Sequence, residues 1–379
     1  MISVETIGMI ALLAILSILV VVNRRKISFS RFFIFYAAMY RTKRGLATMD
    51  RLANKYRWLW TKLATPIIII GFLGMGLVVF DLIRGAIMLL TSTAPPSVGV
   101  VLPFKAKGIF YVPFFYWIIS IFAILIIHEG MHGVMARVYN LRVKNSGLVV
   151  IGAIIPLIPG AFVEPDERKL ALAPKKQQLA VYAAGPVSNI VTGALLMLLL
   201  TVAVAPWTDT FYAKDGVVIT ELAEGAPAQL AGLVPGDKII GLNGQVVNTA
   251  EEFSTQLKDA KPGDTAIIRT TVESKTVILE ATPDNGKARL GVYVDNPLKY
   301  NTWWAKTVLW IEDLLVWLAL LSLGVGLFNL VPLGPIDGGR MLLTGLQHVT
   351  HHKNAHMIWR SVSLFLFAIL ITQVFMAFV

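Results

Sequence analysis

The chain has 379 residues, of which 56% are hydrophobic and only 15% are charged, and its formal net charge is +11. Soluble globular domains carry about a quarter charged residues, so the composition excludes an ordinary soluble protein and indicates a polytopic membrane protein. Cysteine is absent, which excludes disulfides and thiolate chemistry, and lysine and arginine gather beside apolar runs as the positive-inside rule describes, so we expect no nucleic-acid partner.

The first apolar run, residues 7–22, is about one membrane thickness long and is followed by a basic cluster. A secretory signal peptide carries its positive charges before the apolar core, so we predict a retained helix whose N-terminus lies outside the cell. The basic stretch 24–62 then lies in the cytoplasm, and a second span covers 65–91. Residues 1–105 are accordingly predicted to form N-terminal transmembrane helices and a basic cytoplasmic segment.

Residues 106–207 contain two further predicted spans, at about 109–138 and 179–205. Between them lies the apolar stretch 147–165, which is rich in glycine and proline and is therefore a poor helix. Non-helical backbone at membrane depth is tolerated only where it is buried in protein or lines a wet cavity. We predict a short membrane-associated β segment here, formed by strands or a re-entrant hairpin.

Residues 208–297 differ in kind, because they have ordinary charge content and short alternating apolar runs separated by turn signals. One helix is indicated where Thr249 can act as a cap and Glu252 stands three residues later, as in a capping box. We predict a soluble α/β domain that is inserted between transmembrane parts and lies outside the cell.

Two more spans follow this insert, at about 310–333 within residues 298–340 and at about 357–378 within residues 341–379. The chain is thus expected to have about six transmembrane helices. Three histidines at four-residue intervals precede the last span: His348, His352 and His356. They indicate a polar cytoplasmic connector or, alternatively, a second metal or pH-sensing site.

Three polar side chains interrupt the third span: His128, Glu129 and His132. Such residues are expensive at membrane depth and mark functional sites by default. The two histidines are four residues apart, so they lie on one face of a helix and can ligate a single Zn²⁺, with Glu129 beside them as general base. A soluble surface helix can carry the same pattern by chance, but the apolar surroundings favour a metal site.

A catalytic zinc commonly has three protein ligands and one open position, so a third ligand must come from elsewhere. Asp337 lies at the cytoplasmic end of the fifth span, at the depth of the two histidines. Pro332 and Pro335 break the helix before it, and Gly338 and Gly339 allow backbone to pass closely. We predict that Asp337 completes a site for one zinc per chain; the alternative is an interfacial aspartate that caps the next segment.

Three motifs occur in the order known from one family. They are His128-Glu129-Gly130-Met131-His132, Gly185-Pro186-x-x-Asn189 and Asn329-x-x-Pro332-x-x-x-x-Asp337-Gly338-Gly339. On these motifs the chain resembles the site-2 protease family of intramembrane zinc metalloproteases, and its third, fourth and fifth spans resemble the three-helix core of that family. The resemblance covers roughly residues 109–340.

The resemblance implies a role for each polar residue of these motifs. It implies three zinc ligands and a catalytic base: His128, His132, Asp337 and, as the base, Glu129. It also implies that Asn189 and Asn329 lie near the metal, where they can orient substrate or stabilise an oxyanion. Hydrogen bonding between helices is the alternative role for both asparagines.

The inserted domain resembles a PDZ domain of the protease-associated type. The resemblance lies in residues 224–247, where a small-residue helix leads through Pro-Gly-Asp to a strand and an Asn-Gly turn. PDZ grooves bind extended peptides by adding a strand to a sheet edge. We expect the PDZ-like domain to bind a peptide or the external domain of a substrate, or alternatively to act as a lid that filters substrates by size.

Together these features predict a zinc endopeptidase embedded in the cell membrane, which cleaves in or beside the transmembrane segments of other membrane proteins. The zinc site is expected towards the cytoplasm, where a polar path can supply water, and the N-terminus and the PDZ-like domain are expected outside. Two alternatives stay open. One is a divalent metal transporter that uses the same histidines and aspartate, and the other is a catalytically silent scaffold that binds partners through its PDZ-like domain.

Overall fold

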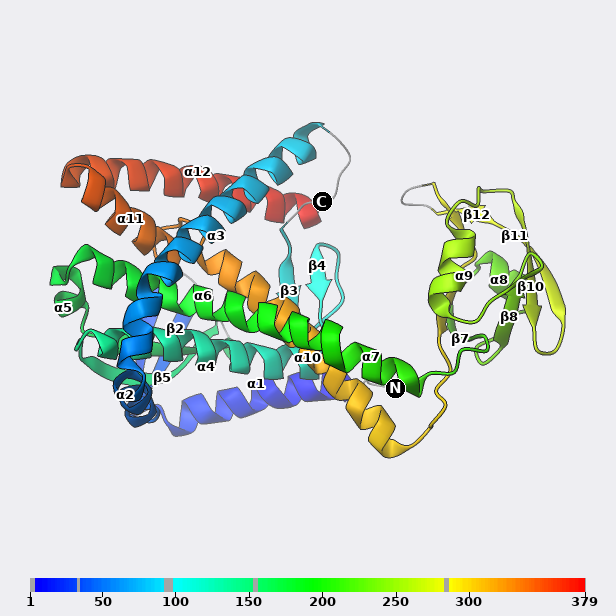
Figure 1. Cartoon of the computed structure of the whole chain (residues 1–379), viewed down its shortest axis with the longest axis horizontal. Helices are drawn as coiled ribbons and strands as arrows, with labels where there is room; N and C mark the ends of the chain where they lie inside the picture. The colour runs from blue at the N-terminus through cyan, green and yellow to red at the C-terminus, as the bar shows by residue number, and fades with distance from the viewer. Residues whose placement is uncertain (1–3, 33–34, 92–97, 153–155, 283–285, 379) are drawn as a thin grey trace. The chain divides into compact units, whose positions relative to one another are not determined.

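The computed structural model describes residues 4–32, 35–91, 98–152, 156–282 and 286–378. The chain divides into two compact units (Figure 1). Met1–Leu200 and Asp313–Val379 form the first, here called the membrane unit, and Thr201–Glu312 form the second, here called the insert unit. The predicted soluble domain, 208–297, lies within the insert unit.

Six helices in the described residues are long and apolar enough to cross a membrane, as predicted. They are α1 (Val4–Val22), α3 (Arg57–Thr91), α4 (Phe114–Val138), the run Lys175–Phe211 that begins with α6 (Lys175–Leu199), α10 (Trp303–Asn329) and α12 (His352–Phe378). The α3 helix begins earlier than expected, within the basic segment. The protein is therefore a multi-pass membrane protein.

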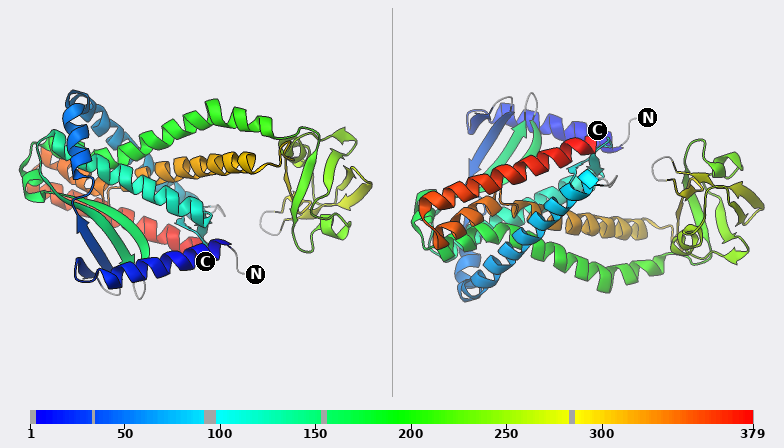
Figure 2. Two further views of the ribbon diagram at one scale, coloured as in Figure 1. Left: turned by 90° about the horizontal axis from the view of Figure 1, so that it is seen from below. Right: turned by 90° about the horizontal axis from the view of Figure 1, so that it is seen from above.

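A four-stranded antiparallel sheet belongs to the membrane unit (Figure 2). Its order is β1 (Ile27–Phe32), β2 (Phe35–Thr42), β5 (Val143–Gly152) and β6 (Pro156–Pro165). The prediction of strands in 147–165 is confirmed for β5 and β6, while residues 153–155 lie outside the described residues. The strands β1 and β2 were not predicted, and they bring part of the basic segment into the same sheet.

The sheet lies against the helix that carries the histidines. The edge strand β6 contacts both α4 and α1. The short helix α2 (Leu46–Lys55) also packs on the second half of α4, where the Nε atom of Arg137 lies 3.1 Å from the Oδ1 atom of Asp50. A side chain at Gly133 would collide there with Met49. These contacts hold the second half of α4 between the sheet and α2, which we predicted only as part of a basic segment.

A sharp break separates α10 from α11 (Asp337–Val349), as the prolines predicted. The chain turns back so closely that a side chain at Gly338 would collide with the carbonyl oxygen of Leu330, and one at Gly339 with that of Leu333. The expected close approach of backbone at these two glycines is confirmed. It places Asp337 at the first residue of α11.

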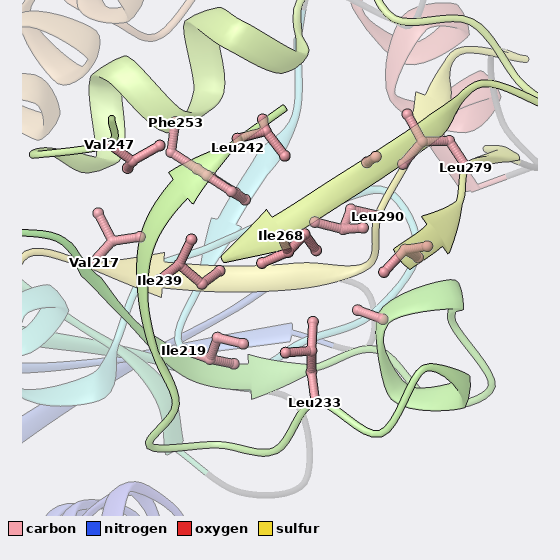
Figure 3. Close-up of a cluster of buried hydrophobic side chains, with 13 residues drawn as sticks. Val217, Ile219, Leu233, Ile239, Leu242, Val247, Phe253, Ile268, Leu279 and Leu290 are labelled. Atoms are coloured by element: carbon pink, nitrogen blue, oxygen red, sulfur yellow. The ribbon is translucent and has the colours of Figure 1, made fainter. Parts of the chain in front are cut away.

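The insert unit contains a small α/β domain around one sheet, with strand order β11-β10-β8-β7-β14 and β9 paired to β8. The strands are β7 (Val217–Leu222), β8 (Lys238–Leu242), β9 (Gln245–Val246), β10 (Thr265–Thr270), β11 (Ser274–Ile278) and β14 (Val292–Asp295). Two helices accompany them, α8 (Pro227–Leu230) and α9 (Ala250–Leu257). Figure 3 shows the side chains of Ile219, Ile239 and Ile268 converging with Phe253 of α9 in the buried core.

The predicted cap of α9 is confirmed, because the Thr249 side chain accepts a hydrogen bond of 3.2 Å from the backbone N–H of Glu252. The Glu252 carboxylate in turn accepts one of 2.8 Å from the N–H of Asn248. The insert is thus an α/β domain with its own hydrophobic core, as the alternating pattern and turn signals predicted.

Candidate metal centre

The centre is built on α4, where His128 and His132 lie one turn apart and are both buried. Their Nε2 atoms are 3.2 Å apart, and Asp337 Oδ2 lies 3.1 Å from the first and 3.2 Å from the second. The three atoms form a nearly equilateral triangle and could hold a metal ion. Ligand atoms bound to tetrahedral zinc at ~2.0–2.1 Å lie roughly 3.3 Å from one another, so this donor set fits zinc.

The ring of His132 is oriented by the backbone of α6. Its Nδ1 lies 2.7 Å from the carbonyl oxygen of Val181. A carbonyl oxygen can only accept, so Nδ1 carries the hydrogen and donates it. The lone pair of Nε2 is then directed towards the triangle, which is the arrangement that a metal-binding histidine requires.

The ring of His128 is oriented by the side-chain amide of Asn189, which lies 3.1 Å from its Nδ1 atom. Asn189 lies in α6 and is completely buried. In the structure its amide nitrogen faces the ring, and its Oδ1 atom then has no hydrogen-bond partner among the described residues. Amide nitrogen and oxygen exchange places by a half-turn of the group. With Oδ1 facing the ring, His128 donates from Nδ1 and keeps its Nε2 lone pair for the metal.

The space beside the two imidazoles depends on Gly185 of α6. A Cβ atom at this position would lie 2.8 Å from His128 Nε2 and closer still to His132 Nε2. Only a residue without a side chain leaves this space open. The Gly-Pro motif therefore supplies room next to two of the three donor atoms, a role that its sequence alone did not indicate.

Glu129 is half-buried beside the triangle and is held by the edge of the sheet. Its Oε2 atom accepts a hydrogen bond of 2.9 Å from the backbone N–H of Val163 in β6. In a strand, the N–H and C=O groups of one residue point to the same side, and those of the next residue point to the opposite side. Residues two apart therefore direct their backbone groups to the same side. Val163 and Ala161 therefore direct their backbone groups away from β5, next to the predicted base.

A cavity of about 690 Å³ opens at this point. Its walls include the three donor residues, Glu129 and Asn329, together with backbone of β6. Charged residues form another part of the wall: Lys144, Glu164, Glu167, Arg168 and Arg340. The cavity beside the triangle thus has many polar and charged side chains in its wall.

Electrostatics keep the third donor ionised. Burial opposes the charge of Asp337, but protons held on the neighbouring imidazoles of His132 and His128 outweigh it and hold the pKa of the carboxyl below its usual value; a metal ion would take the place of these protons. An ionised carboxylate can donate a lone pair to a metal. On the cavity wall, the pKa of Glu164 is also lowered, chiefly by a hydrogen bond of 3.0 Å from the Asn145 amide.

The structure separates the two predicted asparagines. Asn329, the last residue of α10, lies on the cavity wall and donates one hydrogen bond of 2.9 Å to the Val325 carbonyl of its own helix. Asn189 does not line the cavity and instead contacts the far side of the His128 ring. Its geometry is that of a residue that positions a metal ligand, which differs from the contact with substrate that the resemblance allowed.

The insert unit has a separate cavity, of about 510 Å³, along its edge strand β14 and the helix α9. Phe253 and Leu257 of α9 form part of its apolar wall with Leu290 and Val292. Backbone groups of an edge strand are available for pairing with an added strand. An open groove is therefore present where a peptide can extend the sheet.

Comparisons with known proteins concern the chain as a whole. The model of Peptidase family M50 matches residues 116–371. An uncharacterized protein of Methanocaldococcus jannaschii is 31% identical over 306 residues, covering 79% of this chain and 74% of that protein. The zinc metalloprotease RasP of Geobacillus kaustophilus is 25% identical over 240 residues, and the match spans 50% of this chain and 57% of RasP.

Among solved structures, the PDZ domain of an SdrC-like protein from Listeria monocytogenes is 26% identical to this chain, with a TM-score of 0.20. That similarity covers 21% of this chain and 87% of the PDZ domain. The family match, in contrast, extends over most of the chain and includes the histidines, the aspartate and the helices that carry them. The chain therefore belongs to Peptidase family M50, the site-2 protease family of membrane-embedded zinc metalloproteases.

Proposed function

We propose that this protein hydrolyses peptide bonds in or beside the transmembrane segments of other membrane proteins, with His128, His132 and Asp337 as its zinc ligands and Glu129 as its base. One observation carries the proposal. Three donor atoms lie 3.1–3.2 Å apart, with both imidazoles able to present Nε2, beside a cavity that also exposes Glu129.

The chemistry follows from what lines this cavity. Zinc, when bound, would polarise the scissile carbonyl and lower the pKa of a water molecule. The Glu129 carboxylate can take the proton from the attacking water and later deliver it to the leaving amide nitrogen. Asn329 has a second amide hydrogen besides the one bound by Val325, and it can donate this hydrogen to the oxygen that becomes negative in the transition state.

The charge distribution supports an orientation. Basic residues dominate the connection 23–56, and the connection 139–174 has four basic and three acidic residues; both lie at the same end of the spans as the metal triangle. The positive-inside rule places that end in the cytoplasm. The N-terminus and the PDZ-like domain then lie outside, and the charged cavity wall supplies water from the cytoplasm.

The edge of β6 is suited to hold an unwound substrate. A transmembrane helix hides its carbonyls in internal hydrogen bonds, so it must be extended locally before it is cut. Ala161 and Val163 offer outward backbone groups for pairing, whereas Pro159 and Pro165 on either side have no N–H to donate. A substrate strand paired here would run past Glu129.

The PDZ-like domain is proposed to act on a partner in one of two ways, by binding a peptide or by excluding a large external domain. Its groove along β14 fits an extended peptide, which can come from a substrate or from another protein. A folded external domain of a substrate would be too large for the groove and would be held back, as a size filter requires.

The test is cleavage of single-span model substrates by the purified protein and by Glu129→Gln, with the zinc content of both determined. We expect about one zinc per chain in each protein, and a cleavage rate at least about a hundredfold lower in the variant. Gly130→Ala is the matched control, because a methyl group at this neighbouring position meets nothing within 4 Å. Cleavage that survives in Glu129→Gln would overturn the mechanism, and zinc transport without cleavage would favour a transporter.

A further inference from the structure

A second cavity of the membrane unit, of about 1040 Å³, lies between α12 and the loop that joins α10 to α11. Its floor is apolar and includes Leu364, Phe367 and Leu370 of α12. Its charged lining residues are the cations Lys353 and Arg360, and none of its described lining residues is acidic. The cavity is distinct from the metal centre, and the proteolytic reaction gives it no role.

The cations and the apolar residues follow one another along a single helix face. Lys353 and Arg360 are seven residues, or two turns, apart, and Leu364 and Phe367 continue the same face at helical spacing. The face therefore changes from cationic to apolar along the axis of α12. A ligand that lies along it needs a negative group at one end and hydrocarbon at the other.

The depth of these residues matches that of a lipid headgroup. Arg360 is the last charged residue described in α12, and the 18 uncharged residues 361–378 that follow it span about 27 Å at 1.5 Å per residue. The hydrocarbon core of a bilayer is about 30 Å thick, so Arg360 lies close to the level of the headgroups and Leu364 just within the hydrocarbon. Neither Lys353 nor Arg360 forms an ion pair with any described residue.

A third observation concerns Trp359, which also lines this cavity. Its indole Nε1 is shielded from solvent and has no hydrogen-bond partner among the described residues. A buried indole N–H usually has an acceptor. Because Nε1 is closed to the cavity as well, a ligand there meets the apolar ring of Trp359 and not its N–H.

From the cations and the apolar floor we propose that this cavity binds an anionic phospholipid, with its phosphate at Lys353 and Arg360 and an acyl chain along Leu364 and Phe367. The bound lipid would also contact the loop before Asp337. Pro335 and Ile336 line both this cavity and the one that contains the metal centre. Lipid composition would thereby act directly on the loop that carries the third metal ligand.

The test is native mass spectrometry of the delipidated full-length protein, titrated with phosphatidylglycerol or with phosphatidylcholine of the same acyl chains. We expect tighter binding of phosphatidylglycerol, and a loss of about thirtyfold in its affinity in the double variant Lys353→Gln/Arg360→Gln. That factor corresponds to two basic residues at about 1 kcal/mol each. Phosphatidylcholine has the same phosphate but also a choline cation, so its affinity should fall much less in this variant.

Two controls separate the site from general charge attraction. Arg24→Gln/Lys26→Gln removes the same charge beside the end of α1, and it should leave phosphatidylglycerol binding at the parent value. Leu364→Trp fills the apolar part without a change of charge, and it should weaken both lipids. Glycerol phosphate, which is a headgroup without chains, should not compete.

The proposal would be overturned by equal affinity for the two lipids, or by a double variant that binds phosphatidylglycerol like the parent. Competition by glycerol phosphate would show that the site binds small anions and does not recognise the acyl chains of a phospholipid. Displacement of phosphatidylglycerol by an equimolar single-span peptide would assign the cavity to a substrate helix instead.

Discussion

Replacement of Gly185 by alanine tests the geometry of the metal centre most directly. The added methyl carbon would lie 2.8 Å from His128 Nε2 and closer to His132 Nε2, whereas carbon atoms at this position essentially never approach a neighbour within 3.0 Å. The His128 ring must therefore retreat by at least 0.2 Å, and the His132 ring by more. Metal–ligand distances tolerate only about ±0.2 Å.

We expect Gly185→Ala to bind zinc at least about a hundredfold more weakly than the parent, a loss of about 2.7 kcal/mol. The assay is competition for zinc with a chromogenic chelator, at a temperature where circular dichroism shows the helices intact. Gly193→Ala is the matched control, because its methyl group on the same helix would lie 2.6 Å from Leu323 Cγ and far from the donors. Zinc affinity equal to that of the parent in Gly185→Ala would refute the assigned geometry.

Three further predictions follow from named contacts. Asn189→Ala removes the partner of His128 Nδ1 and should lower the zinc affinity about 10–100-fold. Asn189→Asp keeps an acceptor at this position and should keep the zinc affinity of the parent. Both variants are measured by the same chelator titration. Ala161→Pro removes an outward N–H of β6 without touching Glu129, so it should abolish cleavage of a single-span substrate while the zinc content stays unchanged; undiminished cleavage would exclude edge pairing. The pKa of Glu164 is lowered, chiefly by Asn145, so its ionised form stabilises the fold above its ordinary pKa and this contribution disappears as the pH falls through the lowered value. The difference in melting temperature between the parent and Glu164→Gln should accordingly shrink as the pH is lowered from 7 to 3, and a constant difference would contradict this assignment.

The sequence predicts the parts of this protein that have local signatures. Six apolar runs of membrane length predict the spans, and the prolines and glycines around Asp337 predict the break before α11. The four-residue spacing of His128 and His132 predicts their common face. Each of these inferences depends on neighbours in sequence, so one chain is sufficient to make it.

The parts that were missed depend on distant partners. The strands β1 and β2 carry one arginine each and are predicted from the sequence only as part of a basic segment, although Ile27 and Phe29 alternate with serines. Their place in the sheet comes from β2 pairing with β5, as Ala37 opposite Ile151 illustrates. A pairing across more than a hundred residues leaves no local pattern.

The contacts that orient the metal centre could not be predicted from the sequence either. The Val181 carbonyl and the Val163 N–H are backbone groups, and any residue would supply them. The role of Gly185 depends on how closely α6 approaches α4, which helix packing decides. The Gly-Pro motif indicated that α6 belongs to the core of the site. Only the fold shows that Gly185 leaves space for the two imidazoles.

The hydrogen bond between Val163 and Glu129 has a consequence for when the enzyme can act. In the structure the Val163 N–H donates its hydrogen bond to the carboxylate of Glu129, the proposed base. A substrate strand that pairs with β6 at this residue must claim the same N–H, and Glu129 is released at that moment. Proton transfer would then be coupled to the binding of an extended chain. A transmembrane segment that stays helical would leave Glu129 hydrogen-bonded to Val163 and unable to act as the base.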